Sequence, residues 1–242
     1  MRMSYRFLVR NDIRHIAKDP MLMTALLAPI AVIMFVRYVF TPLAVWIEEY
    51  YSFDLAAYTS FAAFFLLTVI PLLSGVMTGL LMLDERDENL IAYFGVTPLT
   101  RRGYYRYRLF LPSLLTILSS SLFLLLSDMI EIRVQSLYVL VLSALEAPCI
   151  ALFLAAVAAN KVEGLAISKL CGLLFAGPIV VFFVSEPWQL AGIIIPMYWP
   201  AKSYMLGEYH NQAHSALAFA AGLAYHILIL KFAVRTFTRR MD

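Results

Sequence analysis

The sequence predicts an all-α integral membrane protein with six transmembrane helices. Of its 242 residues, 62% are hydrophobic and only 14% are charged, with a mean hydropathy of +0.79. A soluble domain carries about 25% charged residues. The apolar residues also fall into long runs near the roughly 20 residues that a helix needs to cross a bilayer. We therefore expect one transmembrane domain over residues 1–242.

Basic residues recur at every fourth position before the first apolar run, at Arg2, Arg6, Arg10, Arg14 and Lys18. On a helix this spacing advances only about 40° per step, so these side chains share one stripe. Residues 1–20 are predicted to form an amphipathic interfacial helix, with Arg6, Arg10, Arg14 and Lys18 facing anionic headgroups. A solvated helix is the alternative, and no nucleic-acid partner is expected because the stripe adjoins a span.

The predicted spans are 21–40, 55–83, 109–127, 134–159, 164–184 and 213–234. Arg37, near the end of the first, is expected to snorkel toward the headgroups rather than to contact a substrate. Residues 41–54 are predicted to be an outer loop. The second span contains Ser74, Gly75 and Gly79, small residues that permit close helix contact.

The segment between the fifth and sixth spans, residues 185–212, is apolar but too short and too rich in proline to cross. We expect short re-entrant helices in the outer leaflet there.

The charged segment from Asp84 to Arg108 separates the second and third spans, with acidic residues first and four Arg residues later. Within it, Leu90, Ile91 and Phe94 lie at helical spacing on one face of a short helix that belongs to no span. Gly95 is a helix stop. The following Thr97 is predicted to be an N-cap and Pro98 the first residue of the next helix.

An apolar face outside the bilayer requires either lipid or a partner. The sequence therefore predicts that this short helix binds a partner protein, with a helix resting on the headgroups as the alternative.

The order of a span ending in an Asp-Glu-Arg cluster, a short helix, Thr-Pro and a basic aromatic stretch resembles the membrane subunits of ABC exporters of the ABC-2 type. Residues 10–29 (RNDIRHIAKDPMLMTALLAP) and 160–169 (NKVEGLAISK) are similar to the same family. The resemblance implies that residues 84–108 carry a coupling helix that docks on a cytoplasmic ABC ATPase. It also implies a second permease subunit, identical or not, because one six-span subunit offers half of the enclosure.

The residues that the resemblance assigns to ATPase docking lie on the two inner loops: Glu85, Arg86, Glu88, Leu90, Ile91, Phe94, Thr97, Pro98, Val162 and Glu163. No cofactor is expected in this chain, and ATP and Mg²⁺ are expected in the partner, because the sequence contains no G-x-x-x-x-G-K-[ST] motif. His210 and His214 lack the H-E-x-x-H pattern, so no metal site is expected.

The 19 Lys and Arg residues lie in the N-terminal segment, the two inner loops and the C-terminal segment, except Arg37, Arg133 and Lys202. Positive charge marks the cytoplasmic side. We therefore expect a multi-pass protein of the cell membrane with both termini in the cytoplasm.

Glu146 is an acidic residue in the middle of the fourth span, where a carboxyl group requires a partner or a water-lined cavity. It is either a structural residue bonded to a neighbouring helix or part of a substrate path. We predict the permease subunit of an ATP-driven exporter of an apolar or amphipathic substrate. The alternatives are a membrane scaffold or sensor and a small ion-driven carrier.

Overall fold

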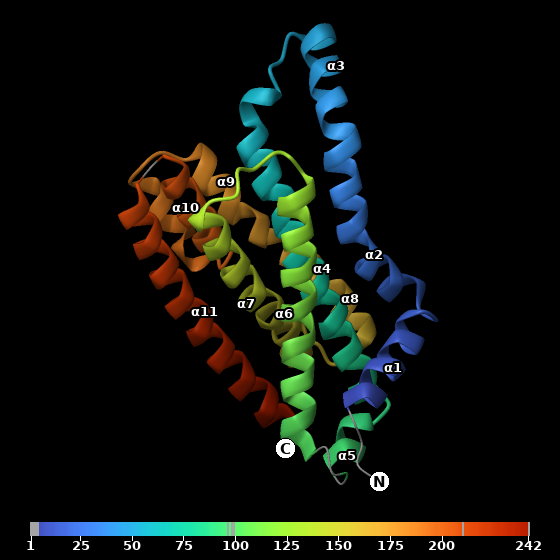
Figure 1. Cartoon of the computed structure of the whole chain (residues 1–242). Helices are drawn as coiled ribbons and strands as arrows, with labels where there is room; N and C mark the ends of the chain where they lie inside the picture. Colours follow the sequence, from blue (N-terminus) through green and yellow to red (C-terminus); the bar gives the residue numbers. More distant parts are fainter. Residues whose placement is uncertain (1–4, 96, 98–99, 210, 242) are drawn as a thin grey trace.

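A computed structural model describes residues 5–95, 97, 100–209 and 211–241, among which helices occur but no strand. The elements, in order, are α1 (Tyr5–Ile16), α2 (Pro20–Phe35), η1 (Val36–Phe40), α3 (Thr41–Tyr51), η2 (Ala56–Tyr58), α4 (Thr59–Asp87), α5 (Leu90–Gly95), α6 (Thr100–Leu126), α7 (Val134–Val157), α8 (Lys161–Ser168), η3 (Lys169–Phe175), α9 (Ala176–Phe183), η4 (Trp188–Ile194), α10 (Tyr198–Glu208) and α11 (Gln212–Met241). Figure 1 shows α1, α5 and the end of α11 at one end of the bundle, and α3 at the opposite end.

The six predicted spans are confirmed as six helical segments long and apolar enough to cross a membrane. They are Pro20–Tyr51, Ala56–Asp87, Gly103–Leu126, Val134–Val157, Lys161–Phe183 and Gln212–Thr238. In the most apolar stretch of the second and fourth, 72% and 78% of the residues are buried, against 17–28% in the other four. α4 and α7 therefore form the centre of the bundle, and the other spans turn much of their apolar surface outward.

Small residues bring α4 and α7 together, as the sequence predicts. A Cβ atom added at Gly75 would lie 2.6 Å from the carbonyl oxygen of Ala147 and 2.7 Å from Cβ of Ile150. One added at Gly79 would lie 3.0 Å from Cβ of Leu154. The two central helices thus approach each other too closely for any side chain at Gly75.

The first span is longer than predicted, and the outer loop expected at residues 41–54 is wrong. Helices α2, η1 and α3 form one continuous rod that ends at Ser52, which has a left-handed φ of 52°. Pro42 does not end the rod, because it is the second residue of α3 and lies two residues after the π-helical turn Val36–Phe40, where the regular hydrogen-bond ladder is already interrupted. Within this turn, Arg37 forms an ion pair with Asp128, which lies in the turn that follows α6.

The third span also begins earlier than predicted. α6 starts at Thr100, so its basic first turns and the apolar span belong to one helix. The predicted N-cap at Thr97 is wrong. The Thr97 hydroxyl instead donates to the carbonyl of Phe94 at 2.8 Å, and the Thr100 hydroxyl accepts from the Gly103 amide at 3.3 Å. Pro98, predicted to open the helix, lies outside the described residues.

The fifth span is divided, because the α-helical turns of α8 and α9 are joined by the 3₁₀ stretch η3. Short helices follow at η4 and α10, as predicted for residues 185–212. α10 is not a surface element, since Tyr198, Ala201 and Tyr204 are buried in the core that α4 and α7 also line. This segment therefore packs as part of the bundle.

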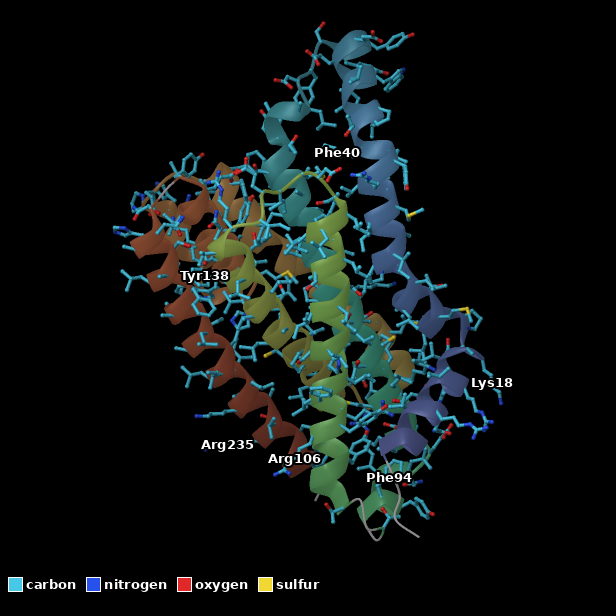
Figure 2. All side chains as sticks on the ribbon, in the orientation of Figure 1. Lys18, Phe40, Phe94, Arg106, Tyr138 and Arg235 are labelled. Carbon is cyan, nitrogen blue, oxygen red and sulfur yellow. The ribbon has the colours of Figure 1, made fainter. Side chains whose placement is uncertain are left out.

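The N-terminal helix α1 lies against the bundle through Leu8, Asp12 and Ile16, which are buried at successive fourth positions. Val9 and Ile13 of the same helix are exposed. Arg10, Arg14 and Lys18 are exposed, and the side chain of Arg6 lies outside the described part. Figure 2 shows Lys18, Arg106 and Arg235 toward the end of the bundle that holds Phe94.

Candidate functional site

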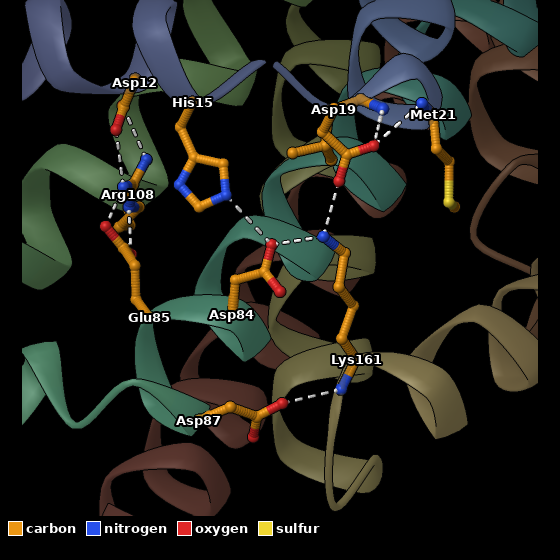
Figure 3. Close-up of polar contacts among 10 residues, drawn as sticks. Asp12, His15, Asp19, Met21, Asp84, Glu85, Asp87, Arg108 and Lys161 are labelled. Carbon is orange, nitrogen blue, oxygen red and sulfur yellow. Dashed lines mark hydrogen bonds and ion pairs between the residues drawn. The ribbon is translucent and has the colours of Figure 1, made fainter. Parts of the chain in front are cut away.

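A buried ionic cluster, here called the Arg108 cluster, joins α1, α4 and α6. The guanidinium of Arg108 donates from Nη1 and Nη2 to the two Asp12 carboxylate oxygens at 2.7 and 2.8 Å. Its Nε donates to Oε2 of Glu85 at 2.8 Å, and its Nη2 contacts Oε1 of the same carboxylate. The three side chains are almost completely buried. Figure 3 shows Arg108 between Asp12 and Glu85. The cluster therefore binds three elements that are far apart in the sequence.

Two tyrosines of α6 complete the hydrogen bonding of the carboxylates. The Tyr104 hydroxyl donates to Glu85 and the Tyr107 hydroxyl to Asp12, each at 2.6 Å. Tyr104 and Arg108 are one helical turn apart, so both reach the same carboxylate. The cluster holds two negative charges and one positive charge, and the hydroxyl groups help to stabilise the excess negative charge. Removal of one partner from a buried ionic group of this kind lowers the free energy of unfolding by several kcal/mol.

A second group, here called the Lys161 cluster, joins the beginnings of α2 and α8 to the end of α4. Nζ of Lys161 donates to Asp19 at 2.6 Å and also contacts Asp84, and Nε2 of His15 lies 3.4 Å from Asp84 (Figure 3). The backbone amide of Lys161 donates to Asp87 at 3.1 Å. This cluster connects the N-terminal segment with both inner loops.

Asp19 has two roles, because Oδ1 also accepts from the backbone amides of Met21 and Leu22 as the N-cap of α2. The hydrogen bond from Lys161 is the largest cause that lowers the pKa of Asp19 below its ordinary value, and the backbone amides act in the same direction. Asp19 is therefore stabilised as a carboxylate.

Several predicted docking residues are covered by the chain itself. Ile91 is 1% exposed and Phe94 is 6% exposed, and the Phe94 ring stacks on Tyr104 at 5.4 Å between centroids. Glu85 is buried in the Arg108 cluster. The prediction of an open apolar face on the short helix is wrong at these positions, because residues of α1, α6 and α11 cover it.

Arg86 is also turned inward. Its Nη1 and Nη2 donate to the carbonyls of Ala155 and Ala158 at 3.0 and 2.6 Å, at the end of α7. A cation there complements the negative end of the helix dipole. Leu90 and Thr97 are partly buried. The inner loops thus use several of their charged residues to hold the chain together.

Of the remaining predicted docking residues, Pro98 lies outside the described residues and the other three are accessible. Glu88 and Val162 are exposed, and Glu163 is exposed at the start of α8, where it accepts from the Ala159 amide at 2.7 Å. Tyr93, which the sequence reasoning did not select, is 59% exposed on α5. At 100° per residue, Tyr93 lies about 60° beyond Leu90 and outside the arc that holds Leu90, Ile91 and Phe94, and this spacing was the signal that could have identified it.

Glu146 lies midway along α7 and is hydrogen-bonded to a neighbouring helix. Its Oε2 lies 2.6 Å from Nε2 of His226 on α11, and both side chains are buried. Nδ1 of His226 lies 2.7 Å from the carbonyl of Gly222. The sequence reasoning missed His226, although the cost of a polar group in an apolar span, which singled out Glu146, applies to it as well.

No group of three or more His, Cys, Asp or Glu residues that could hold a metal ion occurs within the described part of the chain. His214 is bonded to Asn211, with 2.6 Å between Nδ1 and Oδ1, and His210 lies outside that part. The Arg108 and Lys161 clusters thus lie at the end of the bundle that holds α5, and a carboxyl–imidazole pair lies within the spans.

A sequence model of the family described as "Fluoroquinolones export permease protein Rv2686c-like" matches residues 12–234. Two curated relatives, the fluoroquinolones export permease proteins MT2760 and Rv2686c, come from Mycobacterium tuberculosis strains CDC 1551 / Oshkosh and ATCC 25618 / H37Rv. Each is 31% identical over 234 residues, which cover 94% of this chain and 91% of the relative. No solved structure matches the chain significantly. The matched residues include both clusters and the Glu146–His226 pair.

Proposed function

Because the chain belongs to the Rv2686c-like family of fluoroquinolones export permease proteins, we propose that it is the membrane-spanning subunit of an ATP-driven exporter. The energy comes from a separate ATPase that binds ATP and Mg²⁺, since the chain has no P-loop motif of its own. A second permease subunit completes the transporter. The names of the relatives make fluoroquinolones the first substrates to test, within a wider class of apolar or amphipathic compounds.

The observation that carries this proposal is the construction of the bundle end that holds α5. There the Arg108 and Lys161 clusters bind α1, α4, α6 and α8 to one another. Because the two clusters connect these helices, a movement of this surface is transmitted to the spans. We propose that the ATPase docks on this surface, against the exposed side chains of Tyr93, Glu88 and Val162.

The distribution of Lys and Arg supports a cytoplasmic location for this end of the bundle. In that orientation both termini are cytoplasmic, the protein lies in the cell membrane, and α3 and the turn after α6 face outward. The exposed Arg10, Arg14 and Lys18 then lie at the inner headgroups, where each basic residue contributes about 1 kcal/mol of attraction to anionic lipid.

The test is purification of the tagged chain from its native membranes, followed by identification of any P-loop ATPase that co-purifies and by measurement of ATP hydrolysis. Truncation of an exposed aromatic anchor costs about 2 kcal/mol, or roughly 30-fold in affinity. Tyr93→Ala should therefore reduce the amount of bound ATPase. Tyr50→Ala is the matched control, because Tyr50 is 71% exposed on α3 at the opposite end.

Equal ATPase recovery from wild type, Tyr93→Ala and Tyr50→Ala would remove α5 from the docking surface. Recovery of no ATPase together with export that continues without ATP would instead favour an ion-driven carrier. The Glu146–His226 pair is the observation that favours this second candidate, since paired titratable groups within spans also serve proton-coupled transport. Recovery of a partner protein without any transport would favour the third candidate, a membrane scaffold.

A further inference from the structure

A cavity of about 360 Å³ lies beside the Glu146–His226 pair. Its wall is formed by α7, the 3₁₀ stretch η3, Pro196 and α11. Leu170 and Leu173, both on this wall, are exposed, so the cavity extends to the outer surface of the bundle. The other lining side chains are apolar or cysteines, and Glu146 is the one ionisable carboxyl group among the described residues that line it.

Glu146, which lines this cavity, has an unused hydrogen-bond acceptor. Its side chain is 1% exposed, and while Oε2 is bonded to His226, Oε1 is buried without a hydrogen-bond partner in the described part of the structure. A buried polar atom left unpaired is costly. A donor group on a molecule bound in the adjoining cavity would relieve this cost.

The hydrogen bonding of His226 determines what Oε1 can do. The carbonyl of Gly222 can only accept, so Nδ1 of His226 must carry a proton. The pair then shares one further proton, which lies either on Oε2 of Glu146 or on Nε2 of His226. In both arrangements the pair is neutral, and Oε1 carries no proton. Oε1 is therefore an acceptor in either case, and a ligand must donate to it.

We propose that this cavity binds an apolar, uncharged molecule with one hydrogen-bond donor, a hydroxyl or an N–H group, that donates to Oε1 of Glu146. A charged group would leave a net charge in an apolar site, which is costly, whereas a neutral donor satisfies Oε1 and leaves the pair neutral. The apolar walls hold the body of the ligand. The assignment of this cavity as the substrate site of the transporter rests on the proposed function.

The test compares two probes that differ in the donor alone, 1-naphthol and 1-methoxynaphthalene. Binding is followed by probe fluorescence with the purified chain in lipid nanodiscs, and empty nanodiscs serve as the blank. Wild type should bind the naphthol at least about tenfold more tightly, since a site built to bond a polar group discriminates against an analogue that lacks it. Equal affinities for the two probes would overturn the proposal, even if no variant folds.

Two variants test the role of Glu146. In Glu146→Gln the side-chain amide can donate to Nε2 of His226 and leave its carbonyl oxygen as the acceptor, so the preference for the naphthol should persist. In the double variant Glu146→Met/His226→Phe, both Oε1 and the His226 Nε2 that loss of the carboxyl group would free as an acceptor are absent, so the preference should disappear while binding of the methyl ether remains. A double variant that folds and keeps the preference would refute the assignment. These measurements need no ATPase, so they can succeed or fail independently of ATP-driven export.

Discussion

Loss of Arg108 should destabilise the whole bundle. Arg108→Met removes the guanidinium but keeps a side chain of similar reach, and it leaves the Asp12 and Glu85 carboxylates buried and without their cation. Every hydrogen bond from Arg108 to α1 and α4 is lost, whereas the hydroxyls of Tyr104 and Tyr107 still donate to these carboxylates. Removal of one partner of a buried ion pair costs about 3–5 kcal/mol.

For a chain of this size, about 1 kcal/mol corresponds to a shift of roughly 2–4 °C in melting temperature. Arg108→Met should therefore melt roughly 10 °C below the wild type in detergent, followed by fluorescence or by loss of monodisperse protein. Arg106→Met is the matched control, since Arg106 lies on the same helix but is exposed. Surface substitutions of this kind usually change stability by less than about 0.5 kcal/mol.

A double-mutant cycle isolates the cause of the effect. In a Glu85→Gln background, one buried negative charge is already absent, so Arg108→Met should cost at least about 1 kcal/mol less than it does in the wild type. If Arg108→Met and Arg106→Met have the same melting temperature, the Arg108 cluster contributes no net stability. If the two effects at Glu85 and Arg108 add, the residues act independently, and the reasoning from an uncompensated charge is wrong.

Three further predictions concern helix packing, pH and orientation. Gly75→Ala should cost about 1–3 kcal/mol because its methyl group would overlap α7, whereas Gly172→Ala, with nothing within 4 Å of the added Cβ, should leave the melting temperature nearly unchanged. Because the pKa of Asp19 is lowered in the folded state, its carboxylate stabilises the fold above the ordinary aspartate pKa of about 3.9, and this contribution should be lost as the pH falls below that value. Asp19→Asn keeps an N-cap but cannot titrate, so its melting temperature should lack the part of the acid-induced decrease that Asp19 causes in the wild type. An impermeant maleimide added to intact cells should label Glu49→Cys and not Asn89→Cys, and the reverse pattern would invert the proposed orientation.

The sequence by itself determined the fold class, the number of spans and the presence of short helices between the fifth and sixth. These follow from hydropathy and segment length, which are properties of contiguous residues. Gly75 and Gly79 also marked a position of close helix contact, because small size is enough to permit a close approach. Glu146 was identifiable as a residue that needs a partner, because a carboxyl group in an apolar span is costly wherever the span lies.

The tertiary structure alone decided which partner each polar residue has. Phe94 and Glu85 have the sequence features of a docking surface, yet residues from α1 and α6 bury them. Glu146 meets a histidine 80 positions away. Amphipathic spacing shows which residues share a face, but the burial of that face depends on the crossing of distant helices, which local sequence does not encode.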